Sequence, residues 1–136
     1  MSTSESERFR RGWARLSEVD AGGGRRVLES FQDVAPDLAR YIVEFGFGDI
    51  YSRPGLDLRQ RQLVTIAALI ALGGTEPQLE IHVNNGLNVG LSAREIVEAI
   101  LHCIPYTGFP RVLNAMSVAK RVFQERQVAV PRDEDA

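Results

Sequence analysis

The hydrophobic residues of this chain recur at intervals of three and four residues, the periodicity of one face of an α-helix, and no segment alternates as a β-strand would. The pattern begins in residues 4–18, where Ser4 and Glu7 have the spacing of a helix capping box. We predict an amphipathic helix there, with an apolar stripe formed by Phe9, Trp13 and Leu16. That stripe needs a partner surface.

Glycines and prolines divide the next forty residues. The run Gly22–Gly24 is expected to break the first helix, and residues 27–31 are expected to resume it as a short helical turn. Pro36 then opens another helix that continues through Phe45. We predict that residues 46–57 form a loop.

Four more helices are predicted in the remainder of the chain, each from a start signal and a stop signal. The first is an apolar run over 58–72, which starts with Asp57 as a cap and Gln60 three residues later and ends at Gly73 and Gly74. The second is capped by Thr75 and Gln78 and stops at Gly90. The third is introduced by Ser92 and Glu95 and reaches Ile104 before Gly108, and the fourth runs from Pro110 through Phe123. Residues 128–136 read as a flexible polar tail.

These signals predict an all-α protein in which residues 1–136 form a single domain, with the core over about 24–127. The helix at 58–72 is apolar on nearly every side apart from its first turn, which is more than a small monomeric bundle can easily cover. We therefore expect part of this helix, or of the N-terminal one, to be buried by another subunit.

Composition removes several classes of function. A net charge of −2 provides no field that would gather nucleic acid or an acidic membrane. The first twenty residues lack the apolar core of a signal peptide, and the run 63–72 has about half of the roughly 20 residues that cross a bilayer. From the lack of a signal-peptide core we predict a cytoplasmic protein. With one cysteine there is no intramolecular disulfide, no C-x-x-C pair and no Cys-rich zinc site, and we predict no metal centre.

His82 is the first of two acid–base candidates. Gln78 lies four residues before it and Gly86 four residues after it, so on a helix all three share a face. An amide that orients the imidazole, next to a position with no side chain, would form a pocket wall. The alternative is a core histidine that is satisfied by a backbone carbonyl.

His102 is the second candidate. It lies four residues before Tyr106 with Pro105 between them, so we expect a helix kink that frees backbone groups near both side chains. The alternative is that His102 caps the end of its helix, where a cation is favoured.

The lone cysteine and three arginines complete the candidates. Cys103 falls on an apolar line, which favours a packed thiol over a nucleophile. Arg53, Arg59 and Arg61 cluster around a helix start, where they could hold a carboxylate with two hydrogen bonds, or could instead form a solvated or interface-bridging surface.

Several segments between residues 41 and 120 together resemble the carboxymuconolactone decarboxylase family. The most specific are Arg-Pro-Gly-Leu-Asp at 53–57 and Leu-x-x-His at 79–82; the others are 47–52, 61–65, 68–73, Leu87-Asn88, Gly90, Glu95-Ile96, Leu101-His102, Tyr106, Gly108 and Pro110. The resemblance implies an alkylhydroperoxidase D-like helical fold, a trimer or hexamer, and decarboxylation without a cofactor.

The resemblance also implies a branch of this family and a set of site residues. The redox branch carries a C-x-x-C pair where this chain has Thr75 and Gln78, so a dithiol peroxidase is excluded. The decarboxylases show Glu-Leu-x-x-His where this chain reads Gln78 to His82. The expected roles are proton transfer by His82, neutral donation by Gln78 and Tyr106, and carboxylate binding by Arg53, Arg59 or Arg61.

The sequence therefore predicts a cofactor-free decarboxylase, or a related lyase or isomerase, that acts on a small lactone or carboxylic acid. Two alternatives stay open. One is a non-catalytic oligomeric protein of the same fold that binds a small molecule. The other is a peroxidase that uses Cys103 alone, which would need an exposed thiol of low pKa.

Overall fold

The computed structural model describes residues 5–132, and all regular secondary structure in that range is helical, which confirms the all-α prediction. The chain divides into two compact units, residues 1–58 and 59–136, and each has its own hydrophobic cluster. They are described separately. That residues 1–136 act as one domain stays a prediction.

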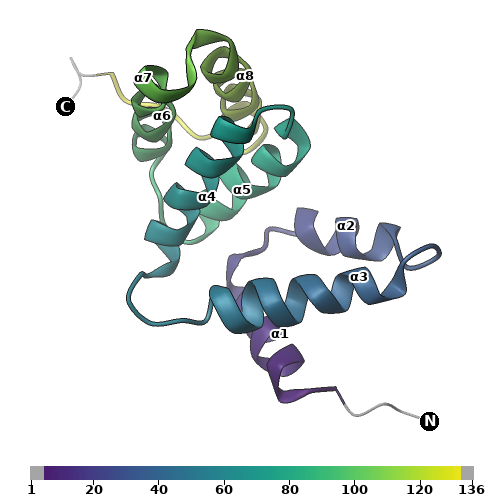
Figure 1. The fold of residues 1–136 in the computed structure, drawn as a ribbon. Coiled ribbons are helices and arrows are strands. Elements are labelled where there is room, and N and C mark those ends of the chain that lie inside the picture. Colours follow the sequence, from purple (N-terminus) through teal and green to yellow (C-terminus); the bar gives the residue numbers. More distant parts are fainter. Residues whose placement is uncertain (1–4, 133–136) are drawn as a thin grey trace. The chain divides into compact units, whose positions relative to one another are not determined.

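The first unit contains three helical segments, labelled in Figure 1. They are α1 (Glu7–Val19), α2 (Gly23–Ser30), and α3 (Pro36–Tyr41), which runs on without a break into the π-helix η1 (Ile42–Ile50). The apolar stripe of α1 meets η1, and the cluster between the helices is formed by Leu16, Leu28, Val43 and Phe47. The predicted stripe thus finds much of its partner within its own unit, through Leu16 and Phe9, while Trp13 stays partly exposed.

The π-helix takes the place of residues 46–50 of the loop predicted for residues 46–57. The helix that was predicted to continue only through Phe45 extends past Gly46 and Gly48 to Ile50. Gly48 serves a close contact instead, because a Cβ atom added to it would lie 2.6 Å from the carbonyl oxygen of Arg8 on α1. Gly12 makes the reciprocal contact from α1, where an added Cβ would lie 2.8 Å from the carbonyl carbon of Val43 and 2.9 Å from the Gly48 nitrogen.

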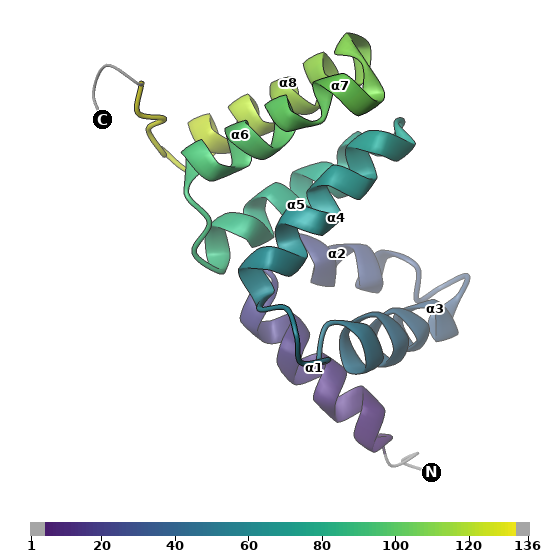
Figure 2. The same cartoon turned by 60° about the vertical axis from the view of Figure 1, so that its left-hand side comes forward.

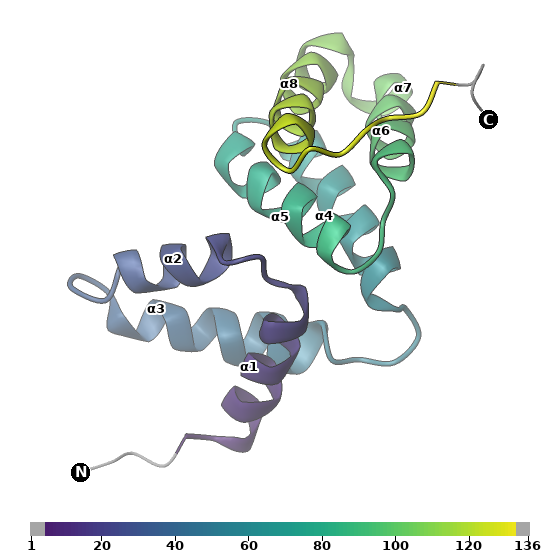
Figure 3. The same cartoon turned by 180° about the vertical axis from the view of Figure 1, so that it is seen from behind.

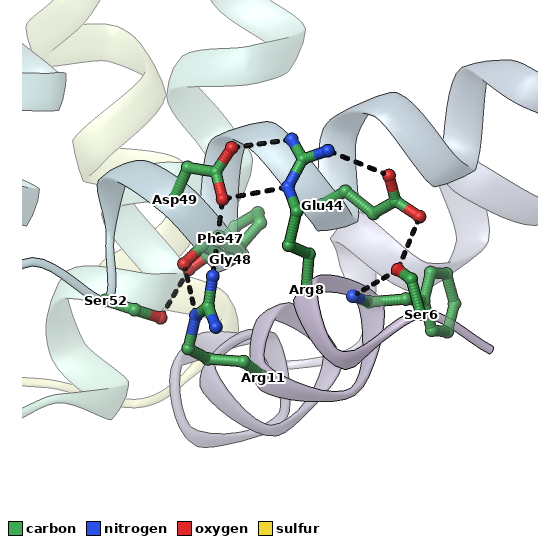
Figure 4. Close-up of polar contacts among 9 residues, drawn as sticks. Ser6, Arg8, Arg11, Glu44, Phe47, Gly48, Asp49 and Ser52 are labelled. Carbon is green, nitrogen blue, oxygen red and sulfur yellow. Dashed lines mark hydrogen bonds and ion pairs between the residues drawn. The ribbon is translucent and has the colours of Figure 1, made fainter.

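Polar contacts hold the same helix pair together at its edge (Figure 4). Arg8 donates to both carboxylate oxygens of Asp49, at 3.1 and 2.6 Å, and its Nη1 lies 3.6 Å from Glu44. These hydrogen bonds hold the pKa of Asp49 below its ordinary value. Ser6 donates to Glu44 at 2.8 Å, and Arg11 donates to the Gly48 carbonyl at 2.8 Å.

The helix that begins at Pro36 was predicted, but the starts of α1 and α2 differ from the prediction. The cap of α1 is Ser6, whose hydroxyl accepts from the Phe9 amide at 3.0 Å, whereas Ser4 lies outside the described residues. Gly22, with φ of 103°, interrupts the helical conformation between α1 and α2, but Gly23 and Gly24 already belong to α2. The reason is Asp20, whose carboxylate accepts from the backbone amides of Gly24 and Arg25 at 2.9 and 3.2 Å and so supports this helix start.

The second unit has α4 and α5 in one layer and α6 and α8 in the other, as Figure 2 shows. The helices are α4 (Leu58–Leu72), α5 (Glu76–Asn88), α6 (Ala93–His102), the short α7 (Ile104–Thr107) and α8 (Phe109–Glu125). The bounds of α4 are those predicted. Gly73 and Gly74 adopt φ of 70° and 68° and reverse the chain between α4 and α5.

One predicted cap in this unit is confirmed and another is wrong. The Ser92 hydroxyl accepts from the Glu95 amide while the Glu95 carboxylate accepts from the Ser92 amide, both at 3.0 Å, which is the predicted capping box. Thr75 precedes α5, but its hydroxyl donates to the Leu69 carbonyl at 2.7 Å and makes no cap bond. Gln78 therefore has no capping partner in Thr75.

The segment that directly follows α8 lies closer to the core than predicted. Val128 packs against the second hydrophobic cluster, and its amide donates to the Phe123 carbonyl at 2.9 Å. Gln127 permits this return by adopting φ of 55° at the end of α8. The segment after α8 turns back toward α6, as Figure 3 shows from behind. It has no helix up to residue 132, and the rest of the predicted tail lies outside the described residues.

Within residues 5–132, no helix combines the length and the apolar character that a membrane span requires.

The first prediction concerns the contact between α1 and η1. Gly12→Ala places a methyl group against the backbone of Val43 and Gly48, where neither backbone can yield without moving a helix. We expect the substitution to cost about 1–3 kcal/mol in the free energy of unfolding, measured by urea denaturation. Gly46→Ala is the matched control, because a Cβ there meets nothing within 4 Å, and we expect it to be neutral or slightly stabilising. Equal losses in both variants would contradict the close packing.

The second prediction concerns the cap of α6. The hydrogen bond from the Ser92 amide is the main reason that the pKa of Glu95 lies below its ordinary value, and the ion pair with Arg59 adds to the effect. A lowered native pKa means that this stabilisation is complete above the unfolded pKa, about 4.3, and is lost as the pH falls through the native value. The stability advantage of wild type over Glu95→Gln should therefore be present at pH 7 and shrink toward pH 3. Glu98→Gln, which removes an exposed carboxylate from the same helix, should not show this trend.

Candidate functional site

His82 lies in the middle of α5, where its side chain is half-buried. Its Nδ1 atom lies 3.0 Å from Oε1 of Gln62, a residue of the neighbouring helix α4. Gln62 is completely buried, with 0% of its surface exposed. The contact joins an acid–base side chain to an amide that has no room to move into solvent.

Gln62 is the site residue that sequence reasoning missed. The buried residues of α4 are Gln62, Ile66 and Ile70, which lie four residues apart on one face of the helix. A glutamine on the same line as two core isoleucines is a polar group placed inside the core, and such groups are rare unless they have a hydrogen-bond partner. The four-residue spacing of Gln62, Ile66 and Ile70 is visible in the sequence and was the signal that could have identified Gln62 as a buried polar residue.

The amide of Gln62 is costly to bury. Its Oε1 is satisfied by His82, but its Nε2 has no hydrogen-bond partner among the described residues. An unsatisfied buried donor costs about 1–3 kcal/mol. Folding stability alone therefore gives little reason for a Gln at this position. Residues that cost stability in this way are common at functional sites.

The two predicted neighbours of His82 have other surroundings. Gln78 lies one turn before His82 on α5 but is exposed, and the amide in contact with the imidazole is that of Gln62. Gly86 is buried, and a Cβ added to it would meet the side chains of Leu91 and Ile96 at 3.0 and 3.6 Å. The small residue thus makes room for core side chains, which differs from the open pocket wall that spacing suggested.

His102 and Tyr106 lie elsewhere, at the junction of α6 and α7. The predicted kink is present, since α6 ends at His102 and α7 begins at Ile104. The rings of His102 and Tyr106 are 5.8 Å apart, and Tyr106 is 78% exposed. His102 lines a hollow of about 660 Å³ together with Glu95 and Glu98, whose carboxylates would repel an anionic substrate.

Cys103 is buried, as predicted. Its thiol donates to the Ala99 carbonyl at 3.3 Å, and burial raises its pKa. A thiol of raised pKa is poorly ionised near neutral pH and makes a weak nucleophile. These properties argue against the single-cysteine peroxidase.

The three predicted arginines are in different surroundings. Arg59 donates to both carboxylate oxygens of Glu95 at 2.8 Å, so it links α4 to α6. Arg61 is half-buried and directly precedes Gln62 on α4. Arg53 belongs to the first unit, in the segment between η1 and α4. Carboxylate binding by any of the three stays a prediction.

No group of three His, Cys, Asp or Glu side chains within the described part of the chain is arranged to hold a metal ion. The arrangement at His82 is instead suited to proton transfer. An imidazole, the kind of side chain that commonly serves as a general acid or base, is held in position by a neutral, buried hydrogen-bond partner.

Comparison with known proteins identifies the family of this chain. Residues 36–121 match the carboxymuconolactone decarboxylase family, a range that includes both Gln62 and His82. The chain is 37% identical over 127 residues to the 4-carboxymuconolactone decarboxylase of Acinetobacter baylyi, which covers 93% of this chain and 94% of that protein.

Two further relatives are similar over shorter regions. An uncharacterized 15.0 kDa protein of Paracoccus denitrificans is 32% identical over 99 residues, covering 72% of this chain and 74% of its own length. The nitrosuccinic acid decarboxylase of Metarhizium robertsii is 36% identical over 86 residues, covering 62% and 58%. From the matched range and the near full-length relative, we conclude that this chain belongs to the carboxymuconolactone decarboxylase family and, with a single cysteine, lacks the C-x-x-C pair of the redox branch.

Proposed function

We propose that this protein is a decarboxylase that needs no cofactor and acts on a small carboxylic acid or lactone, with His82 transferring the proton. The observation that carries the proposal is the hydrogen-bond contact between the half-buried His82 and the fully buried Gln62. The names of two relatives support the reaction class, since both are decarboxylases.

The two named substrates share one chemical feature. In 4-carboxymuconolactone and in nitrosuccinic acid, a carboxylate can leave as CO₂ if the electron pair left behind is delocalised onto electronegative oxygens, those of a lactone carbonyl or of a nitro group. We propose the same substrate class here, namely a small carboxylate with an electron-withdrawing group that can accept the electron pair.

The reaction then has two steps. The bond between carbon and carboxylate breaks, CO₂ leaves, and the electron pair stays on the substrate as an enolate-like or nitronate-like anion. Protonated His82 then gives its proton to the carbon, the ring becomes neutral, and water restores its proton. The protein contributes by stabilising the developing anion and by placing the proton donor beside the carbon.

The other predicted residues are assigned to binding. Arg61, next to Gln62 on α4, and Arg53 are the candidates for holding the substrate carboxylate, because Arg59 already binds Glu95. Gln78, Tyr106 and His102 remain candidates for donating to the oxyanion or for proton transfer. The exposure of Gln78 and Tyr106 favours a role in an assembled site over one in an isolated subunit.

A second candidate function is a non-catalytic protein that binds a small molecule. It is favoured by the identity of the group beside His82, which is an amide and cannot raise the pKa of the imidazole as a carboxylate would. Turnover assays with both named carboxylic acids, run beside a thermal-shift screen, separate the two functions: binding without release of CO₂ would support the second.

The proposed active form is a cytoplasmic trimer or hexamer of the alkylhydroperoxidase D-like type. Helix α4 supports assembly, because Val64 and Leu72 are 60% and 68% exposed although the helix is apolar. Phe109 and Leu113 on α8 are exposed to a similar extent. Apolar side chains of this size are commonly covered by another subunit.

The third prediction separates the two histidines. His82→Ala should lower turnover of an identified substrate by about 10²–10⁴-fold, the usual contribution of a general acid, while costing on the order of 1 kcal/mol in stability. His102→Ala is the control and should have a smaller kinetic effect. Both variants are compared by turnover and by melting temperature. An early-melting His82→Ala protein with normal activity while folded would make His82 structural and move the catalytic centre to His102 and Tyr106.

The fourth prediction concerns assembly. Light scattering at micromolar concentration should give the mass of a trimer or hexamer, and Val64→Glu with Leu72→Glu should lower that mass because both place a charge on the exposed apolar face of α4. Glu98→Gln, on an exposed polar position, is the control. A stable wild-type monomer would refute the proposed assembly.

A further inference from the structure

We propose that Gln62 is a positioning residue that accepts a hydrogen bond from Nδ1–H of His82 in both charge states of the ring, so that Nε2 is the atom that exchanges the proton with the substrate. This inference deepens the proposed function, on which its catalytic part rests. Its structural part concerns the tautomer of one imidazole and can be tested without any substrate.

The geometry selects one nitrogen of the ring. Oε1 of Gln62 lies 3.0 Å from Nδ1 of His82, which is an ordinary hydrogen-bond distance. An amide oxygen only accepts, so Nδ1 must carry the hydrogen. In the neutral imidazole the other nitrogen, Nε2, then holds the lone pair, because a neutral ring has only one N–H.

Burial keeps this partner in place. Gln62 has no exposed surface, and its neighbours along the buried face of α4 are Ile66 and Ile70. A surface glutamine would lose its contact by turning into water, but this side chain has no solvent to enter. The imidazole is therefore oriented by a group that is itself held by core packing.

The two ends of the amide would have opposite effects. With Nε2 of Gln62 toward the ring, the amide would donate to a lone pair on Nδ1, and the hydrogen of the neutral ring would be on its Nε2. A protonated imidazole has N–H groups at both nitrogens, so two donors would then face each other. Only the orientation with Oε1 toward Nδ1 is compatible with both charge states, and a proton-transfer residue passes through both in every cycle.

The amide also differs from a carboxylate in its effect on charge. A carboxylate at this place would orient the ring in the same way and would in addition raise the pKa of the imidazole by Coulomb attraction. Gln62 supplies the orientation without that attraction. The amide therefore determines which ring nitrogen carries the proton without raising the pKa of the ring by charge.

The test measures the tautomer directly. The chain has two histidines, so ¹⁵N-labelled histidine gives two imidazole signal sets in a long-range ¹H–¹⁵N correlation spectrum, and His82→Ala assigns them. Above its pKa, His82 should show a protonated Nδ1 and an unprotonated Nε2. His102, which is exposed and contacts the Tyr106 ring, is the internal control and should show the tautomer mixture of free histidine.

Two variants at residue 62 complete the experiment. Gln62→Leu removes the acceptor, and the neutral His82 ring should shift toward the Nε2–H tautomer that free histidine prefers. Gln62→Glu restores an acceptor, so Nδ1–H should persist while the NMR titration gives a raised pKa for His82. Nδ1–H in Gln62→Leu, or Nε2–H in the wild type, would overturn the inference, and the wild-type measurement decides even if a variant fails to fold.

Kinetics test the catalytic part separately. Loss of orientation in Gln62→Leu should lower kcat by about 10²-fold with little change in KM, because the residue positions the ring and does not bind substrate. The result expected for Gln62→Glu is partial recovery of kcat. If His82 has the predicted tautomer but the protein releases no CO₂, the structural inference stands and the proposed function is refuted. If the protein decarboxylates its substrate but His82 has the other tautomer, the proposed function stands and the inference is refuted.

Discussion

The burial of the Gln62 amide is the constraint on which the candidate site depends. Its place in line with Ile66 and Ile70 puts a polar group in an apolar core, where it needs a partner to offset the loss of water. His82 is that partner, from the next helix. The contact therefore joins the His82 face of α5 to α4, and it holds the imidazole by a group that cannot turn into solvent.

The remainder of the second unit makes this meeting possible. Gly73 and Gly74 reverse the chain in a short turn, so that α5 returns beside α4 with His82 near the level of Gln62. The capping box of Ser92 and Glu95 starts α6, and the ion pair of Glu95 with Arg59 joins α6 to the beginning of α4. The site thus lies between helices whose starts and turns are fixed by local contacts.

Local signals in the sequence were sufficient for much of the fold and insufficient for the site. The bounds of α4, the capping box of α6 and the kink at Pro105 follow from neighbouring residues, and all three are found. The loop predicted from residue 46 was wrong up to Ile50, because a glycine that permits close helix packing, such as Gly48, looks the same in sequence as one in a loop. Gln78 was named as the partner of His82 and Gln62 was not, because spacing within one helix is visible in the sequence, whereas a contact between two helices is tertiary. The sequence indicated the burial of Gln62 only through its four-residue spacing from Ile66 and Ile70.

The position of the cysteine bears on the proton transfer that we propose for His82. The positions where the redox branch carries its dithiol, seven and four residues before His82, hold Thr75 and Gln78 here, and the single thiol lies at the end of α6. There it donates to a backbone carbonyl and its pKa is raised by burial, so it is a poor source of thiolate. The amide of Gln62, which contacts the His82 ring, is neutral and supplies neither electrons nor charge. Such a pair can hold a proton at a defined nitrogen and release it, which is the chemistry that protonation of a carbanion requires.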